Sequence, residues 1–305
     1  MEWPSVDSVE LKHLRFRKSF FKIVLPALAL PFYLLLLWIF HSKSEFKSLA
    51  VFKIIRSLGL MDCLDLLLTM AYGAMAIFVP ELLRAGALPD DDPFRVFIKV
   101  ASAMKNSRLL ATPLLTFTLA ANRLIIMIHK NKSPNGNSDF LKKVNFLAQV
   151  VLHLAWFIYI PLFLVFQFTD SGLTFDVNID SFTFTGPYSY RILLAYGGPS
   201  LEVGGFGCMS GVVISIILQK RFNSSSHISP LEIRLIIQSL LICVPICVTS
   251  VLGLLFGPEM TTMPLFFEAW HALAASVPAI NLAVYIVFNP SARKHMLKLL
   301  AGRKD

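Results

Sequence analysis

Two pairs of charged side chains lie inside long apolar stretches of the sequence. Asp62 and Asp65 are three residues apart, and so are Lys105 and Arg108. Residues three apart lie on the same face of a helix, so each pair presents two like charges in one direction. A charge inside an apolar helix is costly and usually faces a partner or a wet cavity. We therefore expect Asp62 and Asp65 both to point inward, or one of them to reach outward, and Lys105 to face an outward-open pocket with Arg108 deeper.

The sequence around these charges is that of a protein that crosses a membrane several times. Of the 305 residues, 55% are hydrophobic and only 15% are charged, whereas soluble domains are about 45–50% apolar. The mean hydropathy is +0.65. About 20 helical residues span the hydrocarbon of a bilayer, and strand-like alternation is absent. We predict an all-α bundle of seven transmembrane helices over residues 21–40, 57–79, 101–128, 145–168, 191–218, 233–256 and 264–288.

The predicted organisation has three parts: an N-terminal tail (1–20), the seven-helix transmembrane domain (21–288), and a tail with a short amphipathic surface helix (289–305). The loop 169–190 is expected to fold as a short hairpin that caps the bundle. Pro290 ends the last apolar helix, and basic residues then alternate with apolar ones. We expect the apolar residues to face lipid: Ala292, Met296, Leu299 and Leu300. The basic residues are expected to face anionic headgroups: Arg293, Lys294 and Lys298.

The distribution of Lys and Arg predicts the orientation, because short cytosolic loops keep basic residues. Fifteen Lys and Arg residues fall in loops 41–56, 129–144 and 219–232 and in the C-terminal tail, against three in the opposite loops. We predict a plasma-membrane protein with its N-terminus outside the cell and its C-terminus in the cytosol. Five basic residues before and at the start of the first helix disagree, and counting them against this orientation still leaves fifteen to eight: Lys12, Arg15, Arg17, Lys18 and Lys22.

The end of the last apolar helix carries a recognisable pattern. Asn281 and Tyr285 lie one turn apart, and a basic amphipathic segment follows them. This arrangement resembles the end of the seventh helix in rhodopsin-like G-protein-coupled receptors, where the motif is Asn-Pro-x-x-Tyr. Leu282 stands where that family has proline. The resemblance implies a receptor that couples to a heterotrimeric G protein and has an eighth, surface helix.

Other landmarks of that family occur in the same order. Asn122-Arg123 ends the third predicted helix, where the family has Asp/Glu-Arg-Tyr, and Pro245 lies 36 residues before Asn281, where the family has its sixth-helix proline. The Asn-Arg pair and the Phe-rich helices are most similar to nematode serpentine chemoreceptors. The family's outer-loop disulfide has no cysteines available here. The resemblance therefore implies a chemosensory receptor whose outer loop is held by contacts other than a disulfide.

The resemblance also assigns a role to Asp62. The segment LGLMD, which ends at Asp62, is similar to the second-helix segment that bears the family's buried aspartate. In the family this residue is a polar hub that meets the region of Asn281 and Tyr285 through waters or a sodium ion. The alternative is that Asp62 is a hydrogen-bonded carboxylate with a structural role alone. No other cofactor or metal is expected.

Three further residues are implied as parts of an activation switch. Arg123 corresponds to the arginine that releases its inactive-state contacts and meets the G protein. Because Asn122 replaces the adjacent acid, the usual neighbouring ion pair cannot form. Pro245 removes a helical hydrogen bond and bends its helix, which in the family lets the sixth helix swing outward. Two alternatives remain open: Arg123 as a basic anchor at the membrane surface, and Pro245 as a packing residue.

The cations of the third helix suggest what the ligand is. Lys105 lies 18 residues before Arg123, about 27 Å along a helix, and hence in the outer half. Amine receptors of the family carry an aspartate at that depth, so the reversed sign predicts an anionic or carbonyl-bearing small molecule. Arg108 is expected deeper, paired with Asp65. Alternatively, both cations only mark the outer end of the helix. Further candidate ligand-binding residues on the fifth and seventh helices are Glu202, Glu268, Trp270 and His271.

Two other classes of protein remain as alternatives. A small transporter or channel would use Asp62, Asp65, Lys105 and Arg108 along a permeation path, and internal repeats that would favour it are not seen. An enzyme would need acid/base or metal-ligand residues at spanning depth, and the His residues show no such spacing. The net charge of +9 suits contact with membrane lipids, and nothing indicates nucleic acid. We predict a receptor without catalytic activity.

Overall fold

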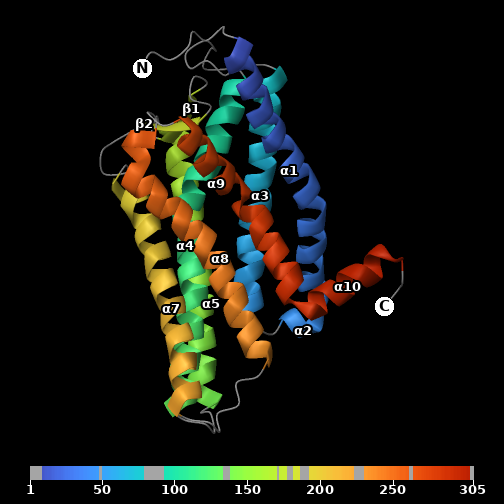
Figure 1. Cartoon of the computed structure of the whole chain (residues 1–305), viewed down its shortest axis with the longest axis vertical. Helices are drawn as coiled ribbons and strands as arrows, with labels where there is room; N and C mark the ends of the chain where they lie inside the picture. The colour runs from blue at the N-terminus through green and yellow to red at the C-terminus, as the bar shows by residue number, and fades with distance from the viewer. Residues whose placement is uncertain are drawn as a thin grey trace.

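The computed structural model describes residues 9–47, 50–78, 93–132, 138–169, 172–176, 181–185, 192–222, 230–260 and 264–302. These residues form an elongated helical bundle with one small hairpin (Figure 1). The long helices are α1 (Val9–Ser42), α3 (Ala50–Phe78), α4 (Pro93–Lys132), α5 (Ser138–Phe168), α7 (Gly198–Phe222), α8 (Pro230–Met260) and α9 (Pro264–Phe288). The shorter elements are α2 (Ser44–Lys47), α10 (Pro290–Leu300), the π-helical turn η1 (Leu193–Gly197), and the strands β1 (Gly172–Asp176) and β2 (Ser181–Thr185).

Six helices in the described part of the chain are long and apolar enough to cross a membrane, so the protein is a multi-pass helical membrane protein. These candidate spans are Ser19–Ser42, Val96–His129, Lys142–Phe168, Gly198–Leu218, Ile233–Leu255 and Ala269–Phe288. The predicted span 57–79 falls in α3, which is not among the six. The predicted count of seven is therefore not confirmed. α3 carries two buried carboxylates and packs against α1, α4, α5 and α9, so its polar residues are covered by protein.

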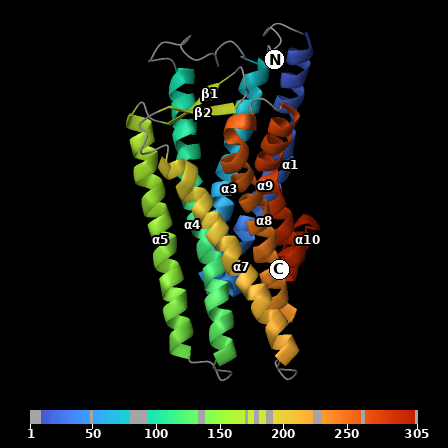
Figure 2. The same cartoon turned by 60° about the vertical axis from the view of Figure 1, so that its left-hand side comes forward.

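The long helices close into a ring. α1 packs against α3, α3 against α4, α4 against α7, α7 against α8, α8 against α9, and α9 returns to α1. α5 packs outside this ring against α4 and α3, at the edge of the bundle in Figure 2. Helices are expected here because lipid offers no hydrogen bonds to the backbone. The ring encloses the buried polar residues described below.

The two ends of the bundle are distinct. β1 and β2 pair antiparallel from Gly172↔Thr185 to Asp176↔Ser181, which confirms the hairpin predicted within residues 169–190. β1 contacts α4. The hairpin lies at one end of the bundle, and α10 lies toward the other end, across the axis of α9 (Figure 1). We call these the hairpin end and the α10 end.

The first helix is longer than predicted. α1 begins at Val9, so residues 9–20 of the predicted N-terminal tail are helical. Its candidate span starts only at Ser19, which leaves about three turns before the apolar part. Residues 1–8 lie outside the described part of the chain.

The predicted amphipathic helix forms, but its apolar residues face a different partner. Asn289 caps α10 by accepting a hydrogen bond from the Ala292 amide at 3.1 Å, and Pro290 follows at the first turn. Ala292 and Met296 are buried in the main hydrophobic core, because α10 packs against α1 and α9. The prediction that these two residues face lipid was wrong, whereas Leu300 is exposed as expected.

Close packing of α7 against α4 leads to a first prediction. A Cβ atom added to Gly198 would lie 2.5 Å from the Leu109 carbonyl oxygen, whereas one added to Gly207, on the same helix, meets nothing within 4 Å. We expect Gly198→Ala to destabilise the protein by about 1–3 kcal/mol, because the helix backbones must separate. Gly207→Ala should change the stability by less than about 1 kcal/mol. Thermal unfolding of the two purified variants in detergent compares them, and equal melting temperatures would contradict the close contact.

Candidate functional site

Asp62 of α3 is the centre of a polar site inside the bundle. Its side chain is 1% exposed. Oδ2 accepts hydrogen bonds from the Tyr33 hydroxyl at 2.7 Å and from Asn281 Nδ2 at 2.9 Å. Oδ1 accepts from Arg108 Nη2 at 2.9 Å. One carboxylate thus joins side chains from α1, α4 and α9 to α3, and the predicted meeting of Asp62 with Asn281 is confirmed as a direct hydrogen bond.

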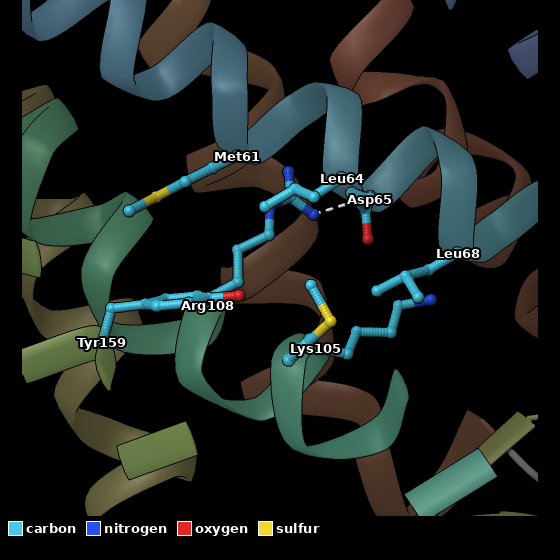
Figure 3. Close-up of a pocket in the computed structure, with 8 residues that line it drawn as sticks. Met61, Leu64, Asp65, Leu68, Lys105, Arg108 and Tyr159 are labelled. Atoms are coloured by element: carbon cyan, nitrogen blue, oxygen red, sulfur yellow. Dashed lines mark ion pairs between the residues drawn. The ribbon is translucent and has the colours of Figure 1, made fainter. Parts of the chain in front are cut away.

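Arg108 bridges both carboxylates of α3. Its Nη1 lies 2.6 Å from Asp65 Oδ2, and its Nη2 lies 2.9 Å from Asp62 Oδ1. Asp62 and Asp65 share a face because they are three residues apart, and the planar guanidinium presents two nitrogens in that direction. Figure 3 shows the ion pair of Arg108 with Asp65 across the gap between α3 and α4. The predicted pairing is confirmed, and the contact with Asp62 is additional.

The site does not fit the sodium ion that the family resemblance implied. Both oxygens of Asp62 already accept hydrogen bonds, and the guanidinium of Arg108 brings a positive charge to 2.9 Å from Oδ1. A second cation there would be repelled by the first. Within the described residues, no group of three or more His, Cys, Asp or Glu side chains is placed to hold a metal ion. Arg108 therefore acts as the countercharge of this site.

Tyr285 lies beside the site without a hydrogen bond to it. Its side chain is fully buried one turn after Asn281, and its ring meets Tyr33 edge to face with centroids 6.4 Å apart. Within the described part of the chain, neither the Tyr285 hydroxyl nor Asn281 Oδ1 has a hydrogen-bond partner. Buried polar atoms are nearly always paired, so these two atoms are exceptions within the described residues.

A small pocket adjoins the ion pairs. It lies between α3, α4 and α5, and Figure 3 shows its residues around the ion pair of Asp65 and Arg108. The Lys105 Nζ atom lies 6.0 Å from the centre of the Tyr72 ring. The structure thus brings Asp65, Lys105 and Arg108 to one pocket, beside Asp62. The lining residues are Met61, Leu64, Asp65, Leu68, Met104, Lys105, Arg108 and Tyr159.

The other predicted ligand-binding residues do not line this pocket. Glu202 of α7 is buried and hydrogen-bonded to Ser250 of α8. Trp270 of α9 donates a hydrogen bond from Nε1 to the Thr249 carbonyl oxygen at 2.7 Å, and its ring contacts His271. The side chain of Glu268 lies outside the described residues. These contacts join α7 and α9 to α8, away from the pocket beside α5.

The predicted switch residues lie on α4 and α8. Asn122 is 3% exposed, and neither its amide nitrogen nor its oxygen has a partner in the described part of the chain. Arg123 follows it toward the α10 end. On α8, the Thr249 hydroxyl donates to the Pro245 carbonyl oxygen at 3.0 Å. The proline has no amide hydrogen to donate, so α8 lacks one backbone hydrogen bond at this point.

Tyr33 was not among the residues predicted for the site. Its hydroxyl makes the shortest hydrogen bond to Asp62, at 2.7 Å. A signal for it does exist in the sequence: the hydroxyl of a buried tyrosine needs a partner, and Tyr33 is surrounded by leucines in the stretch PFYLLLL. Tyr159, which lines the pocket from α5, carries the same signal. What the sequence does not indicate is which helix each hydroxyl faces.

The site therefore combines a shared countercharge, hydrogen bonds between four helices and an adjoining pocket. In this network Arg108 contacts both carboxylates at once. No known protein-family model matches the chain, and a search of curated proteins finds no match.

Proposed function

We propose that the chain is a seven-helix G-protein-coupled receptor of the plasma membrane, with its N-terminus outside and α10 at the cytosolic face. In this proposal α3 also crosses the membrane, which brings the six candidate spans to seven. One observation carries it: Asp62 joins α1, α4 and α9 through Tyr33, Arg108 and Asn281. A receptor needs helices whose relative positions depend on a shared buried contact, and this site supplies one.

The proposed mechanism is a shift between two pairings of the site. A small extracellular molecule that binds one arrangement of α3, α4 and α9 more tightly than another moves the equilibrium toward it. At the α10 end, the break in hydrogen bonding at Pro245 lets the first part of α8 move. Arg123 then meets a heterotrimeric G protein in the cleft that opens. Asn122 cannot pair with Arg123 as an acid would, so the proposal expects either high basal signalling or a different latch for Arg123.

The test is a screen of small molecules in cells that report G-protein signalling. We expect Arg123→Ala to lower both basal and ligand-stimulated responses by at least about tenfold, within the usual range of coupling between sites. Lys142→Ala is the matched control, because Lys142 is exposed at the start of α5, near the end of α4. Surface expression of both variants is measured in parallel. A signal that survives Arg123→Ala at normal expression would contradict the proposal.

A small transporter is a second candidate, favoured by one observation. Asp65, Lys105 and Arg108 line the same pocket, and charged side chains in series can carry an ion or a proton. Reconstitution of the purified protein in lipid vesicles separates the two functions. Substrate flux or ionic current without any partner protein would support the transporter, whereas the receptor needs a G protein for any output.

A further inference from the structure

His153 is an exposed polar residue in the middle part of a membrane span. The candidate span of α5 is Lys142–Phe168, so His153 lies about 17 Å along the helix from its first residue and about 23 Å from its last. The side chain is exposed and has no hydrogen bond or ion pair with any described residue. In the described parts of the six candidate spans, every other exposed ionisable side chain lies within three residues of the end of its span.

The lipid around α5 offers His153 no hydrogen-bond partner. The hydrocarbon core of a bilayer is about 30 Å thick, which places His153 near its middle, whereas the polar groups of lipids lie at the two surfaces. A polar side chain at that depth is costly unless it meets a partner. An imidazole is also too short to reach the surface as a lysine or arginine side chain can. The partner must therefore come from another protein segment inside the membrane.

The exposed face around His153 has the spacing of a helix-packing interface. Six exposed residues follow one another along α5 at intervals of 4, 3, 4, 3 and 4. This is the heptad spacing of two helices that pack at a small crossing angle, the common geometry of helix pairs in membranes. The six residues, which we call the α5 seam, are Phe146, Val150, His153, Phe157, Ile160 and Leu164.

The described part of the chain leaves the α5 seam uncovered. α5 packs against α4 and α3, outside the ring of helices and at the edge of the bundle in Figure 2. Its packed face carries Ala148, Ala155 and Tyr159, which are buried in the main core and lie about half a turn away from the seam. The seam is thus the outward face of the outermost helix, where a neighbouring molecule in the membrane has direct access.

A second copy of this chain supplies what the seam requires. Copies inserted in one membrane share one orientation, so a two-fold axis along the membrane normal brings identical positions of two α5 helices together. A neutral imidazole has one donor and one acceptor nitrogen, and two copies of His153 can therefore satisfy each other. The other five seam residues are apolar, so this single polar pair also fixes the register of the two helices.

We infer that the protein forms a parallel homodimer through the α5 seam, with the two copies of His153 hydrogen-bonded to each other across the two-fold axis. The inference needs α5 to span the membrane and is independent of the proposed receptor function. A dimer without any G-protein signal would contradict the receptor and leave the interface in place. A receptor that signals as a monomer would contradict the interface.

Oxidative cross-linking of the full-length protein in lipid vesicles locates the interface. Phe157→Cys places a thiol in the seam, where it meets its own copy, so we expect a disulfide-linked dimer. Leu28→Cys is the control: Leu28 is exposed on α1, nine residues from the first residue of its span, and Phe157 is eleven from the last residue of its own. The unsubstituted protein, which has four cysteines, gives the background yield. Equal yields from the seam and control variants would overturn the inference.

Variants of His153 test the hydrogen bond itself. Energy transfer between labelled copies, followed as the vesicles are diluted with lipid, gives the dissociation constant of the dimer. We expect His153→Leu to weaken the dimer by about 3–30-fold, the range that one hydrogen bond between membrane helices contributes. His153→Gln keeps a donor and an acceptor and should stay within about twofold of the wild type.

Folding is checked separately, because each variant changes an exposed residue. The melting temperatures of single copies in lipid nanodiscs should agree for the wild type, His153→Leu and His153→Gln. A wild-type protein that is monomeric at every dilution would overturn the inference. So would a His153→Leu variant that dimerises as tightly as the wild type, since the seam would then hold without its polar pair.

Discussion

Replacing Arg108 with methionine is expected to destabilise the protein by about 3–5 kcal/mol, because two buried carboxylates lose their shared countercharge. Asp62 and Asp65 are both buried, and Arg108 lies within 2.9 Å of each. Methionine keeps an unbranched apolar chain, so the change removes the charge more than the packing. The melting temperature in nanodiscs is the measurement, and a decrease of about 5–8 °C is expected.

A variant that removes all three charges tests whether electrostatics is the cause. Replacement of a whole buried ion-paired group by neutral residues is often nearly neutral, whereas removal of one partner is not. We therefore expect the combination of Asp62→Asn, Asp65→Asn and Arg108→Met to regain part of the stability lost in Arg108→Met, because the amide that replaces the Asp62 carboxylate still serves Tyr33 and Asn281 poorly. Lys142→Met is the control for loss of an exposed charge, because Lys142 is 76% exposed. If Arg108→Met melted like the wild type, the ion pairs would not hold α3 to α4.

The second large effect is a difference between two identical substitutions one turn apart. Asp62→Asn is expected to cost about 3 kcal/mol, because the amide group that replaces the carboxylate serves Tyr33, Arg108 and Asn281 poorly and presents two donors of its own. Asp65→Asn should cost about 1 kcal/mol. Its single ion-pair partner, Arg108, keeps Asp62, and the asparagine oxygen can still accept from it.

Thermal unfolding of these two variants under the same conditions gives the difference directly. The two sites are on the same helix and equally deep in the bundle, so the comparison controls for helix propensity and for burial. Equal losses would mean that the contacts with Tyr33 and Asn281 contribute little. A larger loss for Asp65→Asn would place the structural centre of the site at Asp65 and contradict the assignment of Asp62.

The positions of the helices along the chain could be predicted, but the direction that each helix faces could not. Length and apolarity locate the helices, since no other structure satisfies the backbone in lipid. Lipid is as apolar as a leucine-rich core, so apolar residues do not mark the inner face. On α5, Phe157 is 72% exposed while Ala155 is fully buried. Small side chains mark the inner face better than hydrophobic ones, because they let helix backbones approach.

The same reason explains which parts of the site were foreseeable. The pairing of Arg108 with Asp65 could be predicted because a charged side chain on α3 or α4 is costly in lipid unless it meets a partner of opposite charge. The contact of Asp62 with Asn281 followed from a resemblance between motifs. The role of Tyr33 and the location of the pocket beside α5 depend on how α1 and α5 are rotated about their axes, which apolar residues do not indicate. Trp270 faces the backbone of α8 for a similar reason, because an indole is satisfied by any nearby carbonyl.

The docking of α10 determines how motion of the last long helix would spread. Ala292 and Met296 sit in the core, and His295 Nε2 lies 3.1 Å from Glu45 Oε1 of α2. A single residue, Asn289, connects α9 to α10, and its side chain caps the first turn of α10. α10 is thus held at its first turn by Asn289 and near its middle by the contact of His295 with Glu45. Through the contact of His295 with Glu45, any rotation of α9 would also move α2, which connects α1 to α3. The two contacting residues are 250 residues apart in the chain.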